Sequence, residues 1–532
     1  MTIISSITTI SLPEQFNATM AFLDQNIAAG RGAKTAIYYE GQTYTYAQMA
    51  EMANRVGNSL RALGVDMEQR VALLLLDSPQ LAATFFGAIK VGAVPIPINT
   101  MLRADSYEYM LNDSRAKVLC IHASLLHLIR PIQSQLKYVR HIVVVGLEGQ
   151  TSEQGTMQWH DFERWMQRGA PDLVAAETCK DDSAFWLYSS GSTGFPKGCV
   201  HLQHDMTYCT EYYAKPYLNL TPDDILFSTS KLFFAYGLGN GLYFPFAVGA
   251  SSVLYPGRTT PEHIFQVVAQ YRPTIFFGVP TLYTSMLALP DAEKRFDFSS
   301  VRLCVSAGEA LPADILRRWQ EKFHVDILDG IGSTEILHIF ISNMPGEIRP
   351  GSTGKVVPGY EARIVNEQGK PVEQGAIGSL MIRGESTAAC YWNKHQRSKD
   401  VIQGHWILTG DTYYQDVDGY FWYCGRTDDM LKVKGQWVSP AEVEGALVAH
   451  PSVLEAAIVG VKDENDLMQP RAYVVLQDGV APSEELVSEL KDFLKLRLPS
   501  YKCPQDIIFL PELPKTATGK IQRFVLRDSL VF

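Results

Sequence analysis

The alternation of apolar and polar positions predicts layered α/β structure over much of the chain. Residues 46–65 place apolar side chains at helical spacing and end at a glycine, which favours an amphipathic helix. Residues 37–47 alternate around a glycine and predict a β-hairpin. Six short apolar runs then alternate with helical patterns, at 117–122, 141–146, 251–255, 274–279, 302–308 and 326–332. This order is typical of α/β layers with a mostly parallel sheet.

The pattern changes twice in the last third of the chain. From about residue 352, strand alternation and turn dipeptides predict a β-rich module. The polar segment 425–435 follows, and after it come a predicted helix, two strands, a helix and a strand, at 439–450, 453–461, 471–477, 483–498 and 506–510. These elements are enough for a small separate domain. We therefore place a boundary at Asp428, which divides the chain into residues 1–427 and 428–532.

Composition narrows the class of protein. The 532 residues exceed one ordinary core, and a content of 46% hydrophobic and 20% charged residues is typical of soluble globular proteins. A net charge of -10 argues against nucleic-acid binding, and eight cysteines without a C-x-x-C pair favour a reducing compartment. The N-terminus lacks a basic region, and the longest apolar stretch, 71–98, is interrupted by charges and prolines. We expect a cytoplasmic monomer or homodimer without membrane or nucleic-acid partners.

The loop "SSGSTGFPKG", Ser189 to Gly198, follows a predicted strand and has the composition of a phosphate cradle. Its glycines let backbone amides approach phosphate oxygens, and its hydroxyls and Lys197 add further donors. It differs from a Walker loop, because Pro196 precedes the lysine and Gly198 follows it. Taken alone, the loop is equally consistent with a flexible surface connection.

Four further motifs follow the loop: "GIGSTE" (330–335), "TGD" (409–411), "GRTDDMLKVKG" (425–435) and "PKTATGK" (514–520). Together the five resemble the adenylate-forming superfamily of acyl-CoA synthetases, peptide-synthetase adenylation domains and luciferases. The resemblance covers essentially the whole chain, and segments 231–240, 304–312 and 329–340 look most like benzoate-CoA ligases. It implies a large N-terminal domain of two doubly wound α/β subdomains plus a β-barrel-like module. It also implies a small, mobile α+β C-terminal domain.

The resemblance implies a reaction as well as a fold. An aryl acid is activated by ATP with Mg²⁺ to an aryl-adenylate and is then transferred to coenzyme A. Lys520 would bridge the substrate carboxylate and the ATP α-phosphate, a role that suits a compact charge on a long side chain. Glu335 would ligate Mg²⁺ and Thr334 would contact the α-phosphate. The implied catalytic residues are therefore Lys520, Thr334 and Glu335.

The remaining roles follow from the same motifs. Asp411 would accept hydrogen bonds from the ribose hydroxyls, with help from Arg426. Asp428 occupies the family's hinge position, and Lys434, Gly435 and Trp437 would lie near the pantetheine of coenzyme A. The implied ATP- and AMP-binding residues are Ser189, Ser190, Gly191, Ser192, Thr193, Gly194, Lys197, Gly308, Glu309, Ala310, Asp329, Gly330, Ile331, Gly332, Ser333, Asp411 and Arg426.

The predicted acyl pocket indicates the substrate class. Small residues beside one aromatic ring form a short, flat slot, which suits a single aryl ring. Ala235 stands where amino-acid-activating relatives carry an aspartate, which argues against α-amino acids. His338 either faces the aryl ring or is a core histidine, and both interpretations stay open. The implied acyl-site residues are Phe234, Ala235, Tyr236, Gly237, Ala307, Gly330, Ile331 and His338.

Several alternatives accompany this prediction. The enzyme would load an acyl carrier protein instead of coenzyme A, or the chain would be a non-catalytic relative that binds acyl-adenylates. Benzoate, 2-aminobenzoate, 2-hydroxybenzoate and halobenzoates all fit the slot. Cys199, His201 and His204 have a spacing compatible with zinc, but a tetrahedral site needs a fourth ligand. We expect these three residues to open the helix that follows the loop.

Overall fold

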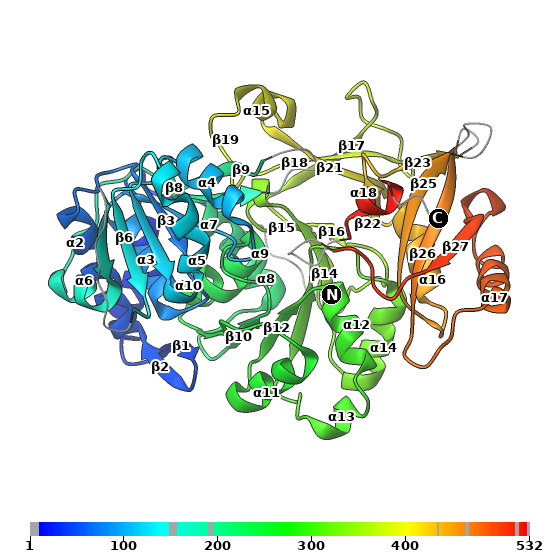
Figure 1. The fold of residues 1–532 in the computed structure, drawn as a ribbon, viewed down its shortest axis with the longest axis horizontal. Coiled ribbons are helices and arrows are strands. Elements are labelled where there is room, and N and C mark those ends of the chain that lie inside the picture. The colour runs from blue at the N-terminus through cyan, green and yellow to red at the C-terminus, as the bar shows by residue number, and fades with distance from the viewer. Residues whose placement is uncertain are drawn as a thin grey trace.

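The structure is a computed structural model that describes residues 10–147, 157–189, 195–433, 436–462, 468–515 and 521–528. Eight predicted site residues lie outside these ranges: Ser190, Gly191, Ser192, Thr193, Gly194, Lys434, Gly435 and Lys520. Figure 1 shows two large sheet-containing layers in the first part of the chain and a smaller C-terminal part beside them.

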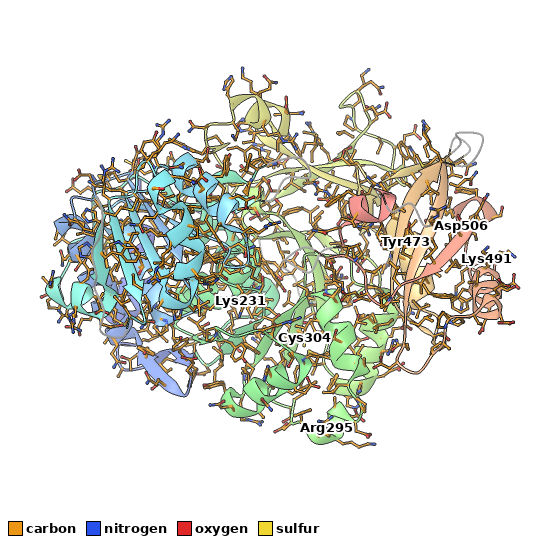
Figure 2. The ribbon with its side chains drawn as sticks, viewed as in Figure 1. Lys231, Arg295, Cys304, Tyr473, Lys491 and Asp506 are labelled. Carbon is orange, nitrogen blue, oxygen red and sulfur yellow. The ribbon has the colours of Figure 1, made fainter. Side chains whose placement is uncertain are left out.

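The largest sheet has nine strands in the order β16-β15-β14-β13-β12-β10-β11-β1-β2. Its six inner strands are parallel, and β15, β16 and β2 add antiparallel edges. The bounds are β1 (Thr35–Tyr39), β2 (Gln42–Thr45), β10 (Ile225–Ser228), β11 (Ser251–Leu254), β12 (Ile275–Gly278), β13 (Leu303–Ser306), β14 (Ile327–Gly332), β15 (Ile339–Ser342) and β16 (Lys355–Val356). Associated helices are α11 (Pro261–Tyr271), α12 (Pro280–Ala288), α13 (Ala292–Arg295) and α14 (Ala313–Phe323). Cys304, labelled in Figure 2, lies fully buried in β13.

The second large sheet is parallel, in the order β4-β3-β5-β6-β7. Its strands are β3 (Arg70–Leu74), β4 (Val94–Pro97), β5 (Val118–His122), β6 (His141–Val145) and β7 (Gln158–Asp161). Its helices are α2 (Tyr46–Ala62), α3 (Pro79–Lys90), α4 (Ala104–Asp113), α5 (Leu126–Ile129) and α6 (Phe162–Arg168). Helices α2 and α3 pack closely at two glycines: a Cβ on Gly87 would lie 2.6 Å from the Ala53 carbonyl oxygen. The two parallel sheets and the helix near 46–65 confirm the α/β prediction.

The phosphate-loop segment connects two strands rather than a strand and a helix. Strand β8 (Ser183–Ser189) pairs antiparallel with β9 (Lys197–Leu202), which pairs with β19 (Cys390–Tyr391). Helix α7 (Asp205–Cys209) begins only after His204. The expectation that these residues open a helix is therefore wrong for Cys199 and His201, which lie in β9, whereas His204 is the N-cap of α7. Backbone hydrogen bonds to β8 and β19 on both sides hold this segment extended.

The β-rich module predicted from about residue 352 is confirmed. Its antiparallel sheet runs β17-β18-β21-β20, with β22 also pairing with β21. The bounds are β17 (Glu361–Val365), β18 (Gly378–Arg383), β20 (Ile402–Gln403), β21 (Trp406–Gln415) and β22 (Phe421–Arg426). Shorter helices elsewhere are α1 (Gln25–Ala28), α8 (Lys215–Leu218), α9 (Ala235–Leu238), α10 (Phe244–Val248) and α15 (His395–Val401).

The C-terminal part contains the predicted order of elements around its own core. Its bounds are β23 (Leu431–Val433), β24 (Gln436–Val438), α16 (Pro440–Val448), β25 (Val453–Lys462), β26 (Met468–Leu476), α17 (Glu484–Lys495), β27 (Asp506–Phe509) and α18 (Arg523–Asp528). Strand β26 lies between antiparallel β25 and parallel β27. Leu447, Ile458, Val474 and Leu490 are fully buried in one apolar cluster there. Among all described residues, no helix is long and apolar enough to cross a bilayer.

A buried carboxylate ties together the starts of three parallel strands in the nine-stranded sheet. Asp224 directly precedes β10, accepts from Thr274 before β12 at 2.6 Å, and pairs with Arg302 before β13 at 3.0 Å. The side chain of Asp224 is only 5% exposed. Burial alone would raise its pKa, but Arg302 and hydrogen bonds from Thr274 and Thr221 together lower it.

We predict that Asp224→Asn lowers the free energy of unfolding by about 2 kcal/mol at pH 7, because Arg302 and Thr274 lose a charged partner. A depressed pKa contributes stability above the unfolded-state value of about 3.9, and this contribution is lost as the pH falls below it. The destabilisation should therefore shrink below about pH 4. Denaturant unfolding across pH measures it, with the exposed neighbour as the control variant Asp223→Asn. Equal effects of the two variants at pH 7 would contradict the prediction.

Candidate active site

The two residues that flank the phosphate loop face a carboxylate from another sheet. Ser189 and Lys197 are directly paired across β8 and β9. The Ser189 hydroxyl donates to Glu335 Oε1 at 3.3 Å. Burial lowers the pKa of Lys197, and the nearby Glu335 opposes this shift. The two described flanks of the loop therefore lie beside Glu335.

Glu335 lies in a one-turn 3₁₀ helix, Thr334–Ile336, immediately after β14. Its Oε1 also accepts a hydrogen bond from the Tyr391 hydroxyl at 2.7 Å. These two hydroxyl contacts hold the Glu335 carboxylate in place. Position 332, just before the turn, has room only for glycine, because a Cβ on Gly332 would lie 2.7 Å from the His338 carbonyl oxygen. Glycine thus lets β14 and β15 converge and place the turn at the sheet edge.

The predicted ribose-binding pair is formed across two strands. Asp411 in β21 is directly opposite Arg426 in β22, and their side chains meet at 2.9 Å. Asp411 is 7% exposed, whereas the Arg426 side chain is half exposed. The Asp411 carboxylate raises the pKa of Arg426, so the guanidinium stays charged beside it. Gly410, at a φ of +77°, provides the left-handed bend before Asp411.

The predicted adenine wall follows the carboxyl ends of neighbouring parallel strands. Gly308, Glu309 and Ala310 follow β13 after Ala307, and Gly308 has a φ of +94°. Asp329 lies in β14, the next strand, and burial raises its pKa. Ligands of open α/β sheets bind at this edge, where side chains and backbone groups leave the sheet. Gly330, Ile331, Gly332 and Ser333 continue from Asp329 along the same edge.

The predicted acyl residues surround the start of α9. Phe234 caps this helix, Ala235 and Gly237 are buried within it, and Ala307 follows β13. The Tyr236 hydroxyl donates to the Val305 carbonyl oxygen at 3.1 Å, which fixes its ring against the sheet. A Cβ on Gly237 would lie 2.1 Å from a backbone oxygen, so this position has no room for a side chain. Tyr236 thus joins α9 to β13, and the acyl-binding role of these residues stays a prediction.

His338 is a core histidine, and a position facing the aryl ring stays a prediction. It is 2% exposed, and its Nε2 bonds Asn240 Oδ1 at 3.1 Å. Burial lowers its pKa to about 3, so the ring is neutral at physiological pH. Among the described residues its Nδ1 has no hydrogen-bond partner. The ring lies 5.6 Å from that of Tyr236, which places a core histidine beside the predicted acyl residues.

A buried carboxylate supports the segment that leads into α9. Asp77, between β3 and α3, accepts from the Leu232 amide at 3.0 Å and lies 4.0 Å from Lys231 Nζ. Lys231 also donates to the carbonyl of Gly257 and is labelled in Figure 2. Burial raises the pKa of Asp77 to about 6. This contact joins the parallel five-stranded sheet to the acyl segment.

The C-terminal motifs lie farther along the chain. Asp428 is exposed in the turn after β22, and Trp437 in β24 is 41% exposed, with Lys432 Nζ 5.4 Å from its ring centroid. The segment before Lys520 and the segment after it are joined by a backbone bridge between Lys515 and Ile521. Lys520 itself lies outside the described residues. Its role, and the hinge and coenzyme A roles of this region, stay predictions.

Tyr391 is a residue that the sequence did not indicate. It reaches Glu335 because β19 pairs with β9, opposite Cys199, almost 200 residues away in sequence. Its ring also lies 4.9 Å from Lys197 Nζ. No local pattern around Tyr391 predicts this contact, because it depends on strand pairing between distant segments.

The geometry gives Cys199, His201 and His204 partners other than a metal. Cys199 Sγ lies 3.8 Å from the Ser189 hydroxyl. His201 contacts Asp205 and the Thr334 carbonyl, and His204 contacts two backbone carbonyls. Within the described ranges, no group of three or more His, Cys, Asp or Glu side chains is arranged to hold a metal ion.

Comparison with known proteins defines the class. The AMP-binding enzyme model matches residues 24–392, and the AMP-binding enzyme C-terminal domain model matches residues 442–520. The chain therefore belongs to the AMP-binding enzyme family, and the adenylate-forming resemblance is confirmed.

Several similar proteins are named as CoA ligases of aryl acids. A benzoate–CoA ligase of Thauera aromatica is 48% identical over 98% of this chain and 97% of its own length. An anthranilate CoA ligase, AuaEII, solved in complex with anthranoyl-AMP, superposes with a TM-score of 0.92 at 44% identity, over 97% of each chain. A benzoate CoA ligase from Burkholderia xenovorans LB400 superposes with a TM-score of 0.88 at 43% identity, over 96% of this chain and 100% of its own.

We predict that Tyr391→Phe weakens ATP binding in the presence of Mg²⁺ by about tenfold. The change removes one hydrogen bond to a charged carboxylate, worth about 1.4 kcal/mol, and keeps the ring beside Lys197. Isothermal titration calorimetry measures the affinity. The control is Tyr138→Phe, at a tyrosine that is 41% exposed. Unchanged affinity in Tyr391→Phe would show that Glu335 does not depend on this hydroxyl.

Proposed function

We propose that this protein is an ATP-dependent aryl-acid–CoA ligase that acts on benzoate or an ortho-substituted benzoate such as 2-aminobenzoate. The observation that carries the proposal is the meeting of two groups of residues at one sheet edge. Glu335 and the flanks of the phosphate loop lie at the end of β14, and the Tyr236–His338 pair lies beside the same strands. Relatives named as benzoate–CoA and anthranilate–CoA ligases support this substrate class.

The first half-reaction joins the aryl carboxylate to AMP. A carboxylate oxygen attacks the α-phosphorus of ATP, and pyrophosphate leaves. This chemistry depends on positioning and charge neutralisation rather than on a protein nucleophile. Ser189, Lys197 and the loop residues between them would hold the β- and γ-phosphates. Asp411 would bind the ribose hydroxyls, with Arg426 keeping its carboxylate oriented.

Mg²⁺ fits the donors around Glu335. Hard cations of this kind take carboxylate, phosphate and water oxygens, and the Glu335 carboxylate is held by two hydroxyl donors. When bound, Mg²⁺ neutralises charge on the phosphates. The protein itself would hold and orient the phosphates through Thr334, Glu335 and Lys197.

The second half-reaction transfers the aryl group to the thiol of coenzyme A, with AMP as the leaving group. We propose that residues 1–427 and 428–532 are the two domains, that Asp428 is their hinge, and that Lys520 serves adenylation. The segment Lys434–Trp437 would serve the thiol step. Asp428 is exposed and lies in a turn, as a hinge residue requires. Loading of an acyl carrier protein is the alternative second step.

The substrate class can be tested directly. Wild-type enzyme should release pyrophosphate with benzoate and small ortho-substituted benzoates, and should form free aryl-CoA without a carrier protein. Acetate offers too little apolar contact, and palmitate exceeds a single-ring pocket. Preference for a fatty acid of eight or more carbons would refute the aryl pocket. Pyrophosphate release without aryl-CoA would support the carrier-protein alternative.

Two variants separate the half-reactions. Lys520→Ala should slow aryl-adenylate formation by about a hundredfold or more, because a charge at the reacting phosphate is lost, and should largely spare transfer from pre-made aryl-AMP. Asp428→Pro fixes the φ angle at the hinge. It should largely spare aryl-adenylate formation and slow transfer to coenzyme A. Single-turnover assays of each step measure both, with the exposed Lys495→Ala as the control. Equal losses in both steps for both variants would contradict the hinge and lysine roles.

A third variant tests the acyl pocket. Ala235 is 8% exposed at the start of α9, so Ala235→Phe would place a ring where the substrate ring belongs. Overpacking typically costs about 1–3 kcal/mol, so the KM for benzoate should rise at least fivefold. The affinity for ATP should stay within twofold, because ATP contacts other residues. Benzoate kinetics like those of the wild type would remove Ala235 from the pocket.

A further inference from the structure

The backbone around the turn that carries Glu335 is strained, so it needs contacts from other segments of the chain to keep its conformation. After the single 3₁₀ turn Thr334–Ile336, Leu337 has a φ of +72° and a ψ of -45°. This region is disfavoured for residues other than glycine, and such conformations persist only where the surroundings fix them. The turn follows β14 directly, so its position relative to the phosphate loop depends on these outside contacts.

Each of the three carbonyl groups of this turn accepts a hydrogen bond from another part of the chain. Two of the donors belong to the segment before β19. The pairs are Ala388 N to Glu335 O at 2.7 Å, Ser386 Oγ to Ile336 O at 2.9 Å and His201 Nε2 to Thr334 O at 2.8 Å. The turn is therefore clamped between β9 and the segment before β19.

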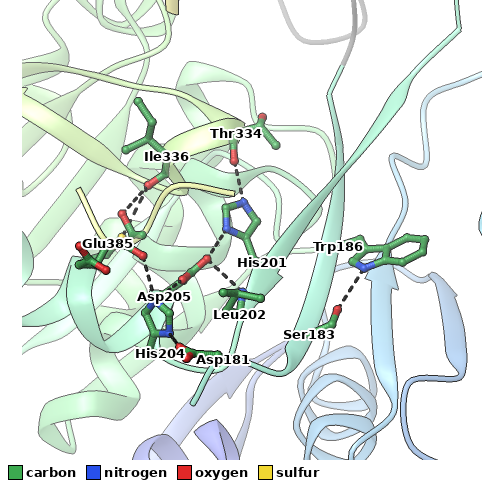
Figure 3. Close-up of polar contacts among 12 residues, drawn as sticks. Asp181, Ser183, Trp186, His201, Leu202, His204, Asp205, Thr334, Ile336 and Glu385 are labelled. Atoms are coloured by element: carbon green, nitrogen blue, oxygen red, sulfur yellow. Dashed lines mark hydrogen bonds and ion pairs between the residues drawn. The ribbon is translucent and has the colours of Figure 1, made fainter. Parts of the chain in front are cut away.

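The His201 contact differs from the other two because it continues to a buried carboxylate. His201 Nδ1 lies 2.7 Å from Asp205 Oδ2, and both side chains are fully buried. Figure 3 shows the His201 ring between Thr334 and Asp205. A carbonyl oxygen only accepts, so the His201 Nε2 donates in the contact with Thr334. The Thr334 carbonyl thus accepts from an imidazole ring that the contact with Asp205 orients.

A second histidine completes the surroundings of Asp205. His204 Nε2 donates to the Glu385 carbonyl at 2.9 Å and lies 3.2 Å from Asp205 Oδ1. Its Nδ1 donates to the Lys180 carbonyl at 2.9 Å, with Asp181 3.4 Å away. Burial alone would lower the pKa of His204, but Asp205 and these oxygens together raise it. The Leu202 amide adds one more donor to Asp205 Oδ2, at 3.1 Å.

We propose that His201, oriented by Asp205, is a positioning residue that fixes the Thr334–Glu335 turn for ATP binding and adenylation. Burial strengthens the hydrogen bond from His201 to Thr334, because the local dielectric is low. Without this bond, the Glu335 carboxylate and the Thr334 side chain would lose part of their fixed direction toward the phosphates. The inference rests on the proposed function, since it assigns Thr334 and Glu335 to the ATP site.

A purely structural role is the competing explanation. The His201 ring stacks on Phe185 at 5.3 Å, so it also fills space in the core. If that were its only role, the His201 variants would lose adenylation activity in proportion to their loss of thermal stability. Two amide substitutions distinguish the roles, since the amide nitrogen of asparagine replaces Nδ1 and that of glutamine replaces Nε2. His201→Asn keeps the Asp205 contact and loses Thr334, whereas His201→Gln keeps Thr334 and loses Asp205.

The experiment measures thermal stability, ATP affinity with Mg²⁺ by calorimetry, and the single-turnover rates of both half-reactions. His201→Asn should slow adenylation at least tenfold and weaken ATP binding at least threefold, with the smaller fall in Tm. His201→Gln should show the larger fall in Tm and adenylate within threefold of wild type. Transfer from pre-made aryl-AMP should stay within threefold in both. The exposed His263 gives the matched controls His263→Asn and His263→Gln.

A wild-type adenylation rate in His201→Asn would overturn the inference. So would rate losses that follow the Tm losses across the two variants. If His201→Gln does not fold, the rate and ATP affinity of His201→Asn decide the question. The calorimetric measurement needs no aryl acid. A failure of the proposed substrate class would therefore show in the wild-type turnover assay, while a weakened ATP affinity in His201→Asn would still support the positioning role.

Discussion

The placement of one partly buried carboxylate, Glu335, constrains much of the architecture around it. A carboxylate in such a position needs donors, because an unpaired charge away from water is costly. Its donors come from β8, through Ser189, and from β19, through Tyr391. Glu335 itself extends from the end of β14 in the nine-stranded sheet. The small β8-β9-β19 sheet and the large sheet must therefore meet at this edge.

The same edge explains why the backbone is unusual there. Because Gly332 has no side chain, β14 and β15 can lie closer together than any other residue at this position would allow. Leu337 adopts a positive φ directly after the turn. Strain of this kind recurs at functional sites because the surrounding contacts can hold it. The buried Asp205 is 130 residues from Glu335 in sequence, yet it acts on the same turn through His201.

The site is assembled from parts that belong to different sheets. Asp77 of the five-stranded parallel layer holds the segment before α9, and Asp411 and Arg426 come from the β-rich module. The residues predicted for the nucleotide and for the acyl group are therefore divided among several sheets.

The sequence by itself determined the α/β class, the β-rich module, the order of C-terminal elements and the motif residues such as Glu335, Asp411 and Tyr236. These features depend on local periodicity and on short motifs, which are readable within a few residues. Tertiary structure alone decided that Cys199 and His201 lie in a strand, because β8 and β19 supply their hydrogen bonds. It also decided the contacts of Tyr391 with Glu335, of His338 with Asn240 and of His201 with Thr334. Such contacts come from the pairing and packing of segments far apart in the chain, and no local pattern encodes them.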